Sequence, residues 1–243
     1  MKLSIIIPAY NEEERIEKTL NSYFSFFNKK FSIKEYEIIV IPNNCSDSTV
    51  NILKKLGKKH ENLVFKEFKK KIGKAGALIE GFKLAEGNLI GFVDADNSAP
   101  PESFFRLLNN INNNDGVIGS RWIKGAEIEL EQPLARRILS RIFNLLVRII
   151  MGLHYHDTQC GCKLFKKEAI KSILPNLEYT KWSFDIELLY QMKRINAKIK
   201  EIPIKWADDS RTHLNIAKAP MQMFIALIKL RILYSPLKFI MKK

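Results

Sequence analysis

The strongest constraint on the fold is a regular alternation of short apolar segments with amphipathic ones. The apolar segments are rich in Ile, Val and Phe, as expected for strands buried on both faces of a sheet. Strand followed by helix, four times over about 100 residues, indicates βαβ units, a parallel sheet and right-handed crossovers. The first helix is expected to begin at Asn11, with Glu14 completing its cap. We expect an α/β fold with strands at residues 3–8, 37–41, 63–68, 89–93, 117–120 and 199–206.

Two carboxylates follow the expected strand at residues 89–93. Asp94 and Asp96 are separated only by Ala95, so a loop can turn both of them toward one cation. Ligands of open α/β sheets bind beyond the carboxyl ends of the strands, and hard carboxylate oxygens suit Mg²⁺ or Mn²⁺. The stretch continues as Asn-Ser-Ala-Pro-Pro, which also favours a solvated turn with a helix cap. Both interpretations are open at this point.

A glycine-rich turn precedes the third expected helix. Backbone amides at a helix N-terminus, together with Lys74, attract an anion such as a phosphate. The turn is not a Walker A loop, because Phe68 stands where that loop needs glycine and Ala75 stands where it needs Ser or Thr. It is not a dinucleotide fingerprint either, since that pattern places its glycines after the first strand. An anion site and a simple helix start both stay open.

The chain is strongly basic: its 243 residues carry 40 Lys and Arg against 26 Asp and Glu, which gives a net charge of +14. This charge favours an anionic partner, which could be nucleic acid, an anionic membrane or a phosphorylated small molecule. The sequence has no nucleic-acid motif, and its aromatic residues sit in apolar helices rather than beside basic ones, which argues against nucleic acid. Cys45, Cys160 and Cys162 make no disulfide framework, so reduced thiols are expected.

Two segments of the second half are candidates for contact with a membrane surface, and the second of them is expected to make it. Residues 134–151 and residues 220–243 both mix apolar side chains with Lys and Arg, as interfacial helices do. An ordinary surface helix and an intramolecular core helix are the respective alternatives. No apolar run reaches the roughly 18 to 20 residues of a bilayer span. One face of the first segment carries Arg137, Arg141, Asn144 and Arg148.

Four stretches in order resemble the family 2 nucleotide-sugar glycosyltransferases, whose fold is called GT-A. They are the opening strand and turn, a turn after the second strand, the Gly-Lys loop and the carboxylate pair. The resemblance extends from Leu3 to about Arg211. The stretches are Ile5-Ile-Ile-Pro-Ala-Tyr-Asn-Glu12, Pro42-Asn-Asn-Cys-Ser-Asp-Ser-Thr49, Lys71-Ile-Gly-Lys-Ala-Gly-Ala77 and Asp94-Ala-Asp96.

The second half is similar to enzymes that load a sugar onto a polyprenyl phosphate. Its closest likeness is to dolichyl-phosphate glucosyltransferases, with dolichyl-phosphate mannosyltransferases as near relatives. The resemblance implies a GT-A catalytic domain at residues 1–212, a membrane-associating tail at 213–243 and a peripheral position on the cytoplasmic membrane face. It is carried by Gly119-Ser-Arg-Trp122, the helix start at Arg136–Ser140, Asp157-Thr-Gln-Cys-Gly-Cys-Lys-Leu-Phe165 and Trp182-Ser-Phe-Asp-Ile-Glu-Leu-Leu189.

The resemblance also implies roles for individual residues. A Mg²⁺ or Mn²⁺ on the leaving diphosphate would be held by Asp94, Asp96 and Ser98. The residues implied for catalysis are Asp94, Asp96 and Arg121, and those for the acceptor phosphate are Arg121, Arg136 and Ser140. The residues implied for donor binding are Pro8, Tyr10, Glu12, Asn43, Lys74 and Asp94. A phosphate acceptor is already anionic, so it can attack the anomeric carbon without a dedicated base, and one displacement inverts the configuration.

Departures from the family pattern leave two points open. Pro42 and Asn43 stand where the family usually has two aspartates at the base-binding turn, which leaves the choice between UDP and GDP open. The likeness to the glucosyltransferases favours UDP-glucose, and GDP-mannose is possible. Ser98 stands where the mannosyltransferases carry a glutamine, which leaves the third metal ligand open. A glycan hydroxyl acceptor is the alternative, and it would need a base, for which Asp157 and Asp185 are the candidates.

Overall fold

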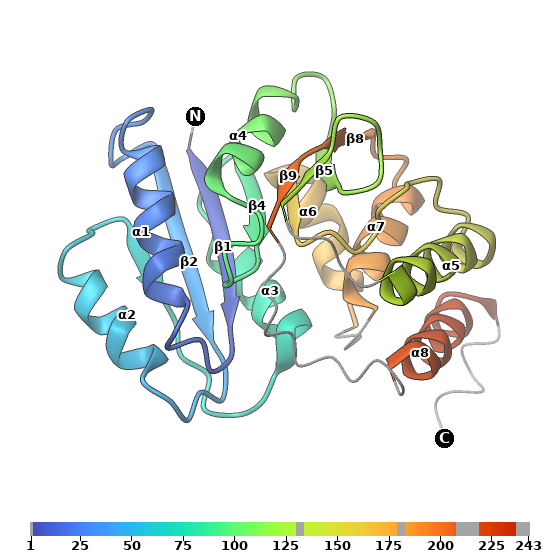
Figure 1. The fold of residues 1–243 in the computed structure, drawn as a ribbon, viewed down its shortest axis with the longest axis horizontal. Helices are drawn as coiled ribbons and strands as arrows, with labels where there is room; N and C mark the ends of the chain where they lie inside the picture. The colour runs from blue at the N-terminus through green and yellow to red at the C-terminus, as the bar shows by residue number, and fades with distance from the viewer. Residues whose placement is uncertain (1, 130–133, 179–182, 208–218, 237–243) are drawn as a thin grey trace.

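The computed structural model describes residues 2–129, 134–178, 183–207 and 219–236, and its centre is a seven-stranded sheet (Figure 1). The strand order is β3-β2-β1-β4-β7-β5-β8. The sheet strands are β1 (Leu3–Ala9), β2 (Tyr36–Pro42), β3 (Leu63–Phe65), β4 (Leu89–Val93), β5 (Gly116–Ser120), β7 (Cys162–Lys166) and β8 (Ile199–Pro203). A separate parallel pair joins β6 (Glu127–Ile128) to β9 (Lys205–Trp206).

Helices cover both faces of this sheet, which is why β1 and β2 are buried along their whole length. Alternate residues of β1 enter two separate cores: Ile5 and Ile7 face α1, α2 and α4, while Ile6 faces α3. The second core also contains side chains of α5 to α8. The helices are α1 (Ile16–Phe27), α2 (Thr49–Gly57), α3 (Gly73–Leu84), α4 (Pro101–Asn109), α5 (Leu134–Met151), α6 (Lys167–Ile173), α7 (Phe184–Arg194) and α8 (Ala219–Leu233).

The sheet is mainly parallel, as predicted, but it contains one strand that the sequence did not reveal. Strand β7 lies between β4 and β5 and runs antiparallel to both of them. It comes from the Cys-Lys-Leu-Phe-Lys stretch, to which no secondary structure was assigned from the sequence. Its pairing places the loop that precedes Cys162 next to the end of β4.

Several boundaries differ from the prediction. The expected strand at residues 199–206 is divided into β8 and β9, because Lys205 and Trp206 pair with β6 in a separate sheet. Helix α1 begins at Ile16, so the expected start at Asn11 was wrong. The Asn11 backbone has a φ of 53°, in the left-handed region, and its side-chain oxygen accepts a hydrogen bond from the Ser46 N–H at 2.8 Å. Its amide is therefore used to join two turns rather than to cap a helix. Strand β3 ends at Phe65, three residues earlier than expected, although Phe68 still forms an isolated bridge with Asn43.

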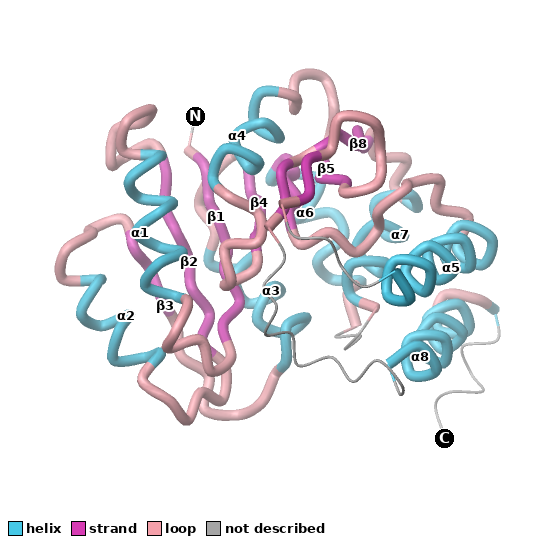
Figure 2. The backbone as a smooth tube through the Cα atoms, viewed as in Figure 1, coloured by secondary structure: helices cyan, strands magenta, loops and turns pink. Residues whose placement is uncertain are grey.

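Helices α5 and α8 pack side by side at one end of the molecule (Figure 2). Helix α8 buries Leu227 and Leu230 in the same core as Val147 of α5, while other apolar side chains of both helices are exposed. No helix in the described parts of the chain is long and apolar enough to cross a membrane. The predicted boundary between residues 212 and 213 lies outside the described residues, so the two-part division stays a prediction.

Candidate active site

A pocket of about 200 Å³ opens at the carboxyl ends of β1, β2 and β4. This is the edge at which the strand-end turns meet, as expected for ligand sites of parallel sheets. All six positions implied for donor binding line it, together with Asp96. The lining residues are Pro8, Ala9, Tyr10, Glu12, Asn43, Lys74, Asp94, Ala95 and Asp96.

The two carboxylates of the Asp-Ala-Asp turn have different partners. Asp94 Oδ1 lies 2.5 Å from the Lys74 ammonium nitrogen, while Asp96 Oδ1 accepts a hydrogen bond from the Ser98 N–H at 2.9 Å. Burial and the nearby charge of Asp94 raise the pKa of Asp96. Burial alone would lower the pKa of Lys74, but the charges of Asp94 and Asp185 and the hydrogen bond with Asp94 outweigh it, so the pKa is raised. The pocket therefore holds a firmly charged lysine beside two carboxylates that repel each other.

Gly161 packs directly against the carboxylate of Asp94. A Cβ atom at this position would lie 1.9 Å from Asp94 Oδ2, so any other residue would displace the carboxylate. The sequence had singled out the stretch that contains this glycine, but not the contact. The close approach follows from β7, which begins one residue later and pairs with β4 so that Cys162 is opposite Val93.

Helix α1 fixes the backbone of the carboxylate turn. The buried Thr19 hydroxyl donates to the Ala95 carbonyl at 2.7 Å, and the Tyr23 hydroxyl donates to the Ala99 carbonyl at 2.8 Å. From the other side, the Ala207 N–H donates to the Ser98 carbonyl at 2.8 Å. These three contacts hold the turn in one conformation, which is what a preorganised ligand site needs.

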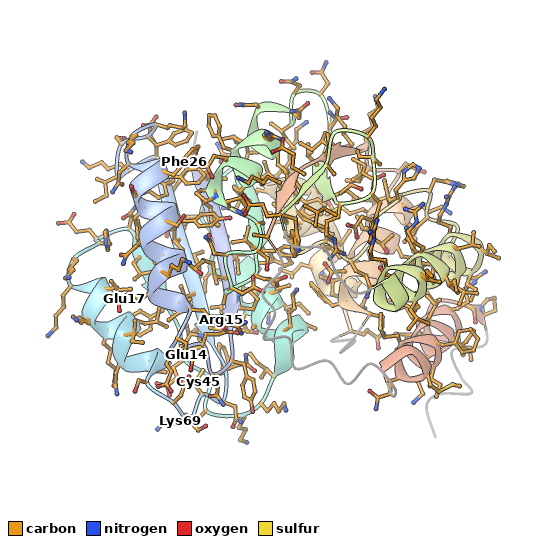
Figure 3. The ribbon with its side chains drawn as sticks, viewed as in Figure 1. Glu14, Arg15, Glu17, Phe26, Cys45 and Lys69 are labelled. Atoms are coloured by element: carbon orange, nitrogen blue, oxygen red, sulfur yellow. The ribbon has the colours of Figure 1, made fainter. Side chains whose placement is uncertain are left out.

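Glu12 adds a third carboxylate to the pocket, and it is paired with Arg15. Both Nε and Nη2 of Arg15 lie 2.7 Å from Glu12 Oε2. Burial raises the pKa of Glu12, and the hydrogen bond from Arg15 opposes that shift. Figure 3 shows Arg15 and Cys45 near the end of the sheet at which β1 and β2 stop. The sequence did not single out Arg15, because its role depends on the turn that precedes α1.

The Asn43 side chain is buried and already hydrogen-bonded within the protein. Its amide nitrogen donates to the Ala9 carbonyl at 3.0 Å, and its amide oxygen accepts from the Gly73 N–H at 3.1 Å. Asn43 thus joins the ends of β1 and β2 to the start of α3. Tyr10, in contrast, is 46% exposed, and its ring lies under the Lys71 ammonium at 5.2 Å from the ring centre.

The donor atoms around Asp94 and Asp96 fit a hard divalent cation. Two carboxylates that repel each other would be stabilised by such a cation, which prefers oxygen ligands. Asn97, in the same turn, has a buried side-chain oxygen for which the described residues provide no hydrogen-bond partner. The described residues contain no cluster of three or more His, Cys, Asp or Glu side chains arranged for a metal. Ser98, implied as the third ligand, is buried beside Asp96, to which its backbone N–H donates.

Arg121, implied for the acceptor phosphate, is held by Asp157. Its Nε and Nη2 donate to the two carboxylate oxygens of Asp157 at 2.7 and 3.0 Å, and its backbone N–H donates to the same carboxylate. The guanidinium also lies 5.0 Å from the Trp206 ring centre. Ser140 is partly buried on α5, and the side chain of Arg136 on that helix lies outside the described part. The structure therefore fixes the position of Arg121, and the acceptor role of Arg121, Arg136 and Ser140 stays a prediction.

The two carboxylates considered as bases for a hydroxyl acceptor are both paired with cationic side chains. Both oxygens of Asp157 bind Arg121, and the residue is 3% exposed. Asp185 Oδ1 lies 2.5 Å from the ammonium of Lys163, which is fully buried and also donates to the Cys160 carbonyl at 2.6 Å. Asp157 thus serves as the support of Arg121 in this structure, and Asp185 as the partner of a buried lysine.

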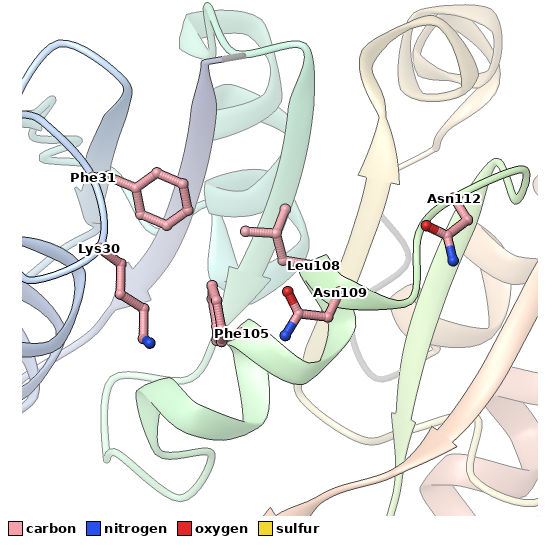
Figure 4. Close-up of a pocket in the computed structure, with 6 residues that line it drawn as sticks. All are labelled: Lys30, Phe31, Phe105, Leu108, Asn109 and Asn112. Carbon is pink, nitrogen blue, oxygen red and sulfur yellow. The ribbon is translucent and has the colours of Figure 1, made fainter.

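A second hollow lies where α1 and α4 end, near the opposite edge of the sheet (Figure 4). Its volume is about 640 Å³, and Lys30 is the only charged residue among the described residues that line it. The Lys30 ammonium lies 4.5 Å from the centre of the Phe105 ring. This hollow lacks the carboxylates of the strand-end pocket, so it is not a second candidate for the same chemistry.

Several known proteins that are similar to this chain share one name, dolichyl-phosphate β-glucosyltransferase. The dolichyl-phosphate β-glucosyltransferase of Dictyostelium discoideum is 32% identical over 244 residues, which cover 96% of this chain and 74% of that protein. The enzyme of the same name from Saccharomyces cerevisiae is 30% identical, covering 96% of this chain and 75% of its own length. The human one is 29% identical, covering 96% and 76%.

Solved structures share the fold. Glucosyl-3-phosphoglycerate synthase from Mycobacterium tuberculosis, in complex with Mn²⁺, UDP-glucose and phosphoglyceric acid, aligns with a TM-score of 0.67 at 16% identity and covers 95% of this chain and 79% of that one. The S. aureus TarS protein with UDP-GlcNAc aligns with a TM-score of 0.63 at 22% identity, covering 97% and 68%. The predicted GT-A fold is confirmed. Residues 4–174 match the model of glycosyl transferase family 2, and the chain is therefore a glycosyltransferase that belongs to this family.

Proposed function

We propose that this glycosyltransferase moves glucose, with inversion, from UDP-glucose to a dolichyl or polyprenyl phosphate. The observation that carries the proposal is one pocket in which Asp94 and Asp96 lie beside the Lys74 ammonium, at the carboxyl ends of the sheet strands. The relatives supply the substrate class, since they are dolichyl-phosphate β-glucosyltransferases that align with 96% of the chain. GDP-mannose stays the alternative donor, because Asn43 has no charge with which to select the base.

On the donor side, the residues would neutralise a leaving diphosphate. Asp94 and Asp96 would hold a Mg²⁺ or Mn²⁺, which supplies Lewis-acid stabilisation of the charge that develops on the leaving group. Lys74 keeps its proton because its pKa is raised, so its ammonium adds a second positive charge at the same end. Tyr10 offers an exposed ring at the pocket for stacking with a base. Asn43 supports this arrangement by fixing the start of α3.

On the acceptor side, Arg121 would orient the attacking phosphate. Asp157 holds the guanidinium through two hydrogen bonds, which fixes its orientation. A phosphate is already anionic near neutral pH, so positioning rather than deprotonation limits its attack. A glycan hydroxyl would need a free base, and the pairings of Asp157 and Asp185 make that acceptor the less supported one.

The outer faces of α5 and α8 would place this site on an anionic membrane. Nine of the thirteen large apolar side chains that are exposed in the described part of the chain lie on these two helices. Neither helix contains an Asp or Glu, while α5 has four arginines and α8 has Lys229 and Arg231. Exposed apolar side chains flanked by cations suit an anionic bilayer surface. This is the surface in which a lipid phosphate acceptor resides.

The test is a panel of UDP- and GDP-sugars offered with a short polyprenyl phosphate and Mg²⁺ or Mn²⁺, read by mass spectrometry. We expect glucosyl polyprenyl phosphate from UDP-glucose, with a β linkage by NMR. The matched control is the corresponding polyprenol, which lacks the phosphate and should accept no sugar. Transfer to the alcohol, or to a free glycan but not to the phosphate, would contradict the proposal.

Arg136→Ala separates the acceptor site from the donor site. The loss of a cation that binds the lipid phosphate should raise the KM for polyprenyl phosphate about 10-fold or more, in line with the roughly 1.5–3 kcal/mol of a charged hydrogen bond. The KM for the nucleotide sugar should stay within experimental error. Equal changes in both constants would count against the acceptor role of this residue.

A further inference from the structure

We propose that Asn144 is a positioning residue that ties helix α5 to the Arg121–Asp157 pair. The inference deepens the proposed function, because it assigns the link between the membrane-facing helix and the arginine of the acceptor site. The link is the segment of residues 155–158, which passes between α5 and the sheet. Nothing in the sequence pattern sets Asn144 apart from the arginines that share its helix face.

Asn144 forms hydrogen bonds with this segment through both the nitrogen and the oxygen of its side-chain amide. Its nitrogen donates to the Tyr155 carbonyl at 3.3 Å and also to the His156 carbonyl. Its oxygen accepts from the Thr158 hydroxyl at 3.4 Å. The hydrogen bonds therefore flank Asp157 on both sides along the chain.

The same segment is held from the sheet by Glu201 of β8. The carboxylate of Glu201 accepts from the backbone N–H groups of His156 at 2.9 Å and of Asp157 at 2.8 Å. The N–H groups are thus anchored to the sheet, while the carbonyl groups are anchored to α5. A movement of α5 relative to the sheet turns the peptide groups that carry Asp157, and with them the carboxylate that orients Arg121.

Only a primary amide meets all three requirements at this position. It supplies two N–H donors for the carbonyls and one oxygen for the hydroxyl of Thr158. Aspartate has nearly the same shape but no donor, so in Asn144→Asp both carbonyls would face a carboxylate. Asn51, an exposed asparagine on α2, offers the matched control Asn51→Asp, which makes the same chemical change away from this segment.

The test reads Arg121 directly by NMR of its Nε–H group, assigned by comparison with the spectrum of Arg121→Lys. Because Nε donates to Asp157 at 2.7 Å, this proton should exchange slowly with water in the wild-type protein and in Asn51→Asp. We expect the slow signal to be lost in Asn144→Asp, while the thermal unfolding midpoint confirms that the variant is folded. A slow, unshifted Arg121 signal in folded Asn144→Asp would overturn the proposal.

A second measurement covers the case in which Asn144→Asp fails to fold. Asn144→Gln keeps the amide but moves it by one methylene, and it should shift the Arg121 signal without abolishing it. In activity assays, the double variant Asn144→Gln with Arg121→Gln should be no more impaired in KM for the acceptor than Arg121→Gln alone. Additive losses would overturn the link. If the wild-type protein transfers no sugar to polyprenyl phosphate, the proposed function fails, while the NMR result still decides the role of Asn144.

Discussion

Gly161→Ala offers a direct test of whether the position of Asp94 controls the cation site. The new Cβ would lie 1.9 Å from Asp94 Oδ2 and 2.6 Å from its Cγ. A relaxed carbon–oxygen contact is about 3.5 Å, so the carboxylate must retreat by roughly 1.6 Å. Because the obstacle is the end of a side chain rather than backbone, the chain should still fold, at a cost at the lower end of the roughly 1–3 kcal/mol of overpacking.

The consequence for cation binding should be larger than that for folding. Metal–ligand distances tolerate only about 0.2 Å, so a carboxylate displaced by more than 1 Å no longer coordinates in the same geometry. We expect the affinity for Mn²⁺ to fall about 10- to 100-fold, the effect typical of losing a supporting contact of a metal site, which corresponds to roughly 1.4–2.8 kcal/mol. The 2.5 Å pair between Asp94 and Lys74 should be lost in the same variant.

Isothermal titration calorimetry with Mn²⁺, in the presence and absence of UDP, measures the affinity, and chemical denaturation measures the stability. Gly57→Ala is the matched control, because its Cβ would meet Phe65 Cε1 at an ordinary 3.5 Å. An unchanged Mn²⁺ affinity in Gly161→Ala, together with loss of binding in Asp94→Asn, would refute the conclusion that packing of Gly161 sets the position of the Asp94 carboxylate.

Three further variants probe the cation site, the backbone that supports it and the exposed face of α5. Asp96→Asn should reduce Mn²⁺ affinity at least about 10-fold and abolish transfer without lowering the unfolding midpoint, and retained activity would remove Asp96 from the metal site. Thr19→Val leaves the buried Ala95 carbonyl without its hydroxyl donor. Urea denaturation should show a loss of about 1–3 kcal/mol, accompanied by weaker Mn²⁺ binding. Ile142→Asp with Ile149→Asp, at two exposed positions of α5, should reduce co-sedimentation with anionic vesicles at an unchanged unfolding midpoint. Equal sedimentation would move the membrane contact elsewhere.

The deepest strands could be read from local pattern alone. Strand β4 is a continuous apolar run, β1 is apolar apart from Ser4, and the structure buries every residue of both. Burial on both faces favours apolar side chains, and the buried Ser4 hydroxyl is satisfied by donating to Glu37 Oε1 at 2.6 Å. The expected carboxyl-end pocket follows from the same logic, since successive parallel strands bring their ends to one edge of the sheet.

The tail illustrates a question that neither pattern nor composition could settle. An apolar, basic helix fits both a membrane surface and an intramolecular core. In the structure one side of α8 packs against the core, where Leu227 and Leu230 are buried, while Phe224 and Ile228 on the same helix stay exposed. Which side faces inward depends on where α5 lies, and that position is set by tertiary packing.

The sequence by itself determined the α/β alternation, the parallel strands, the strand-end carboxylate pair and the excess of positive charge, because each of these is a local property of neighbouring residues. Tertiary structure alone decided that β7 enters the sheet antiparallel, that Gly161 packs on Asp94, and that Asp157 holds Arg121 across 36 positions of the chain. Contacts between distant residues are fixed by which strands pair and by which side chains fill the remaining space. No local periodicity encodes those choices.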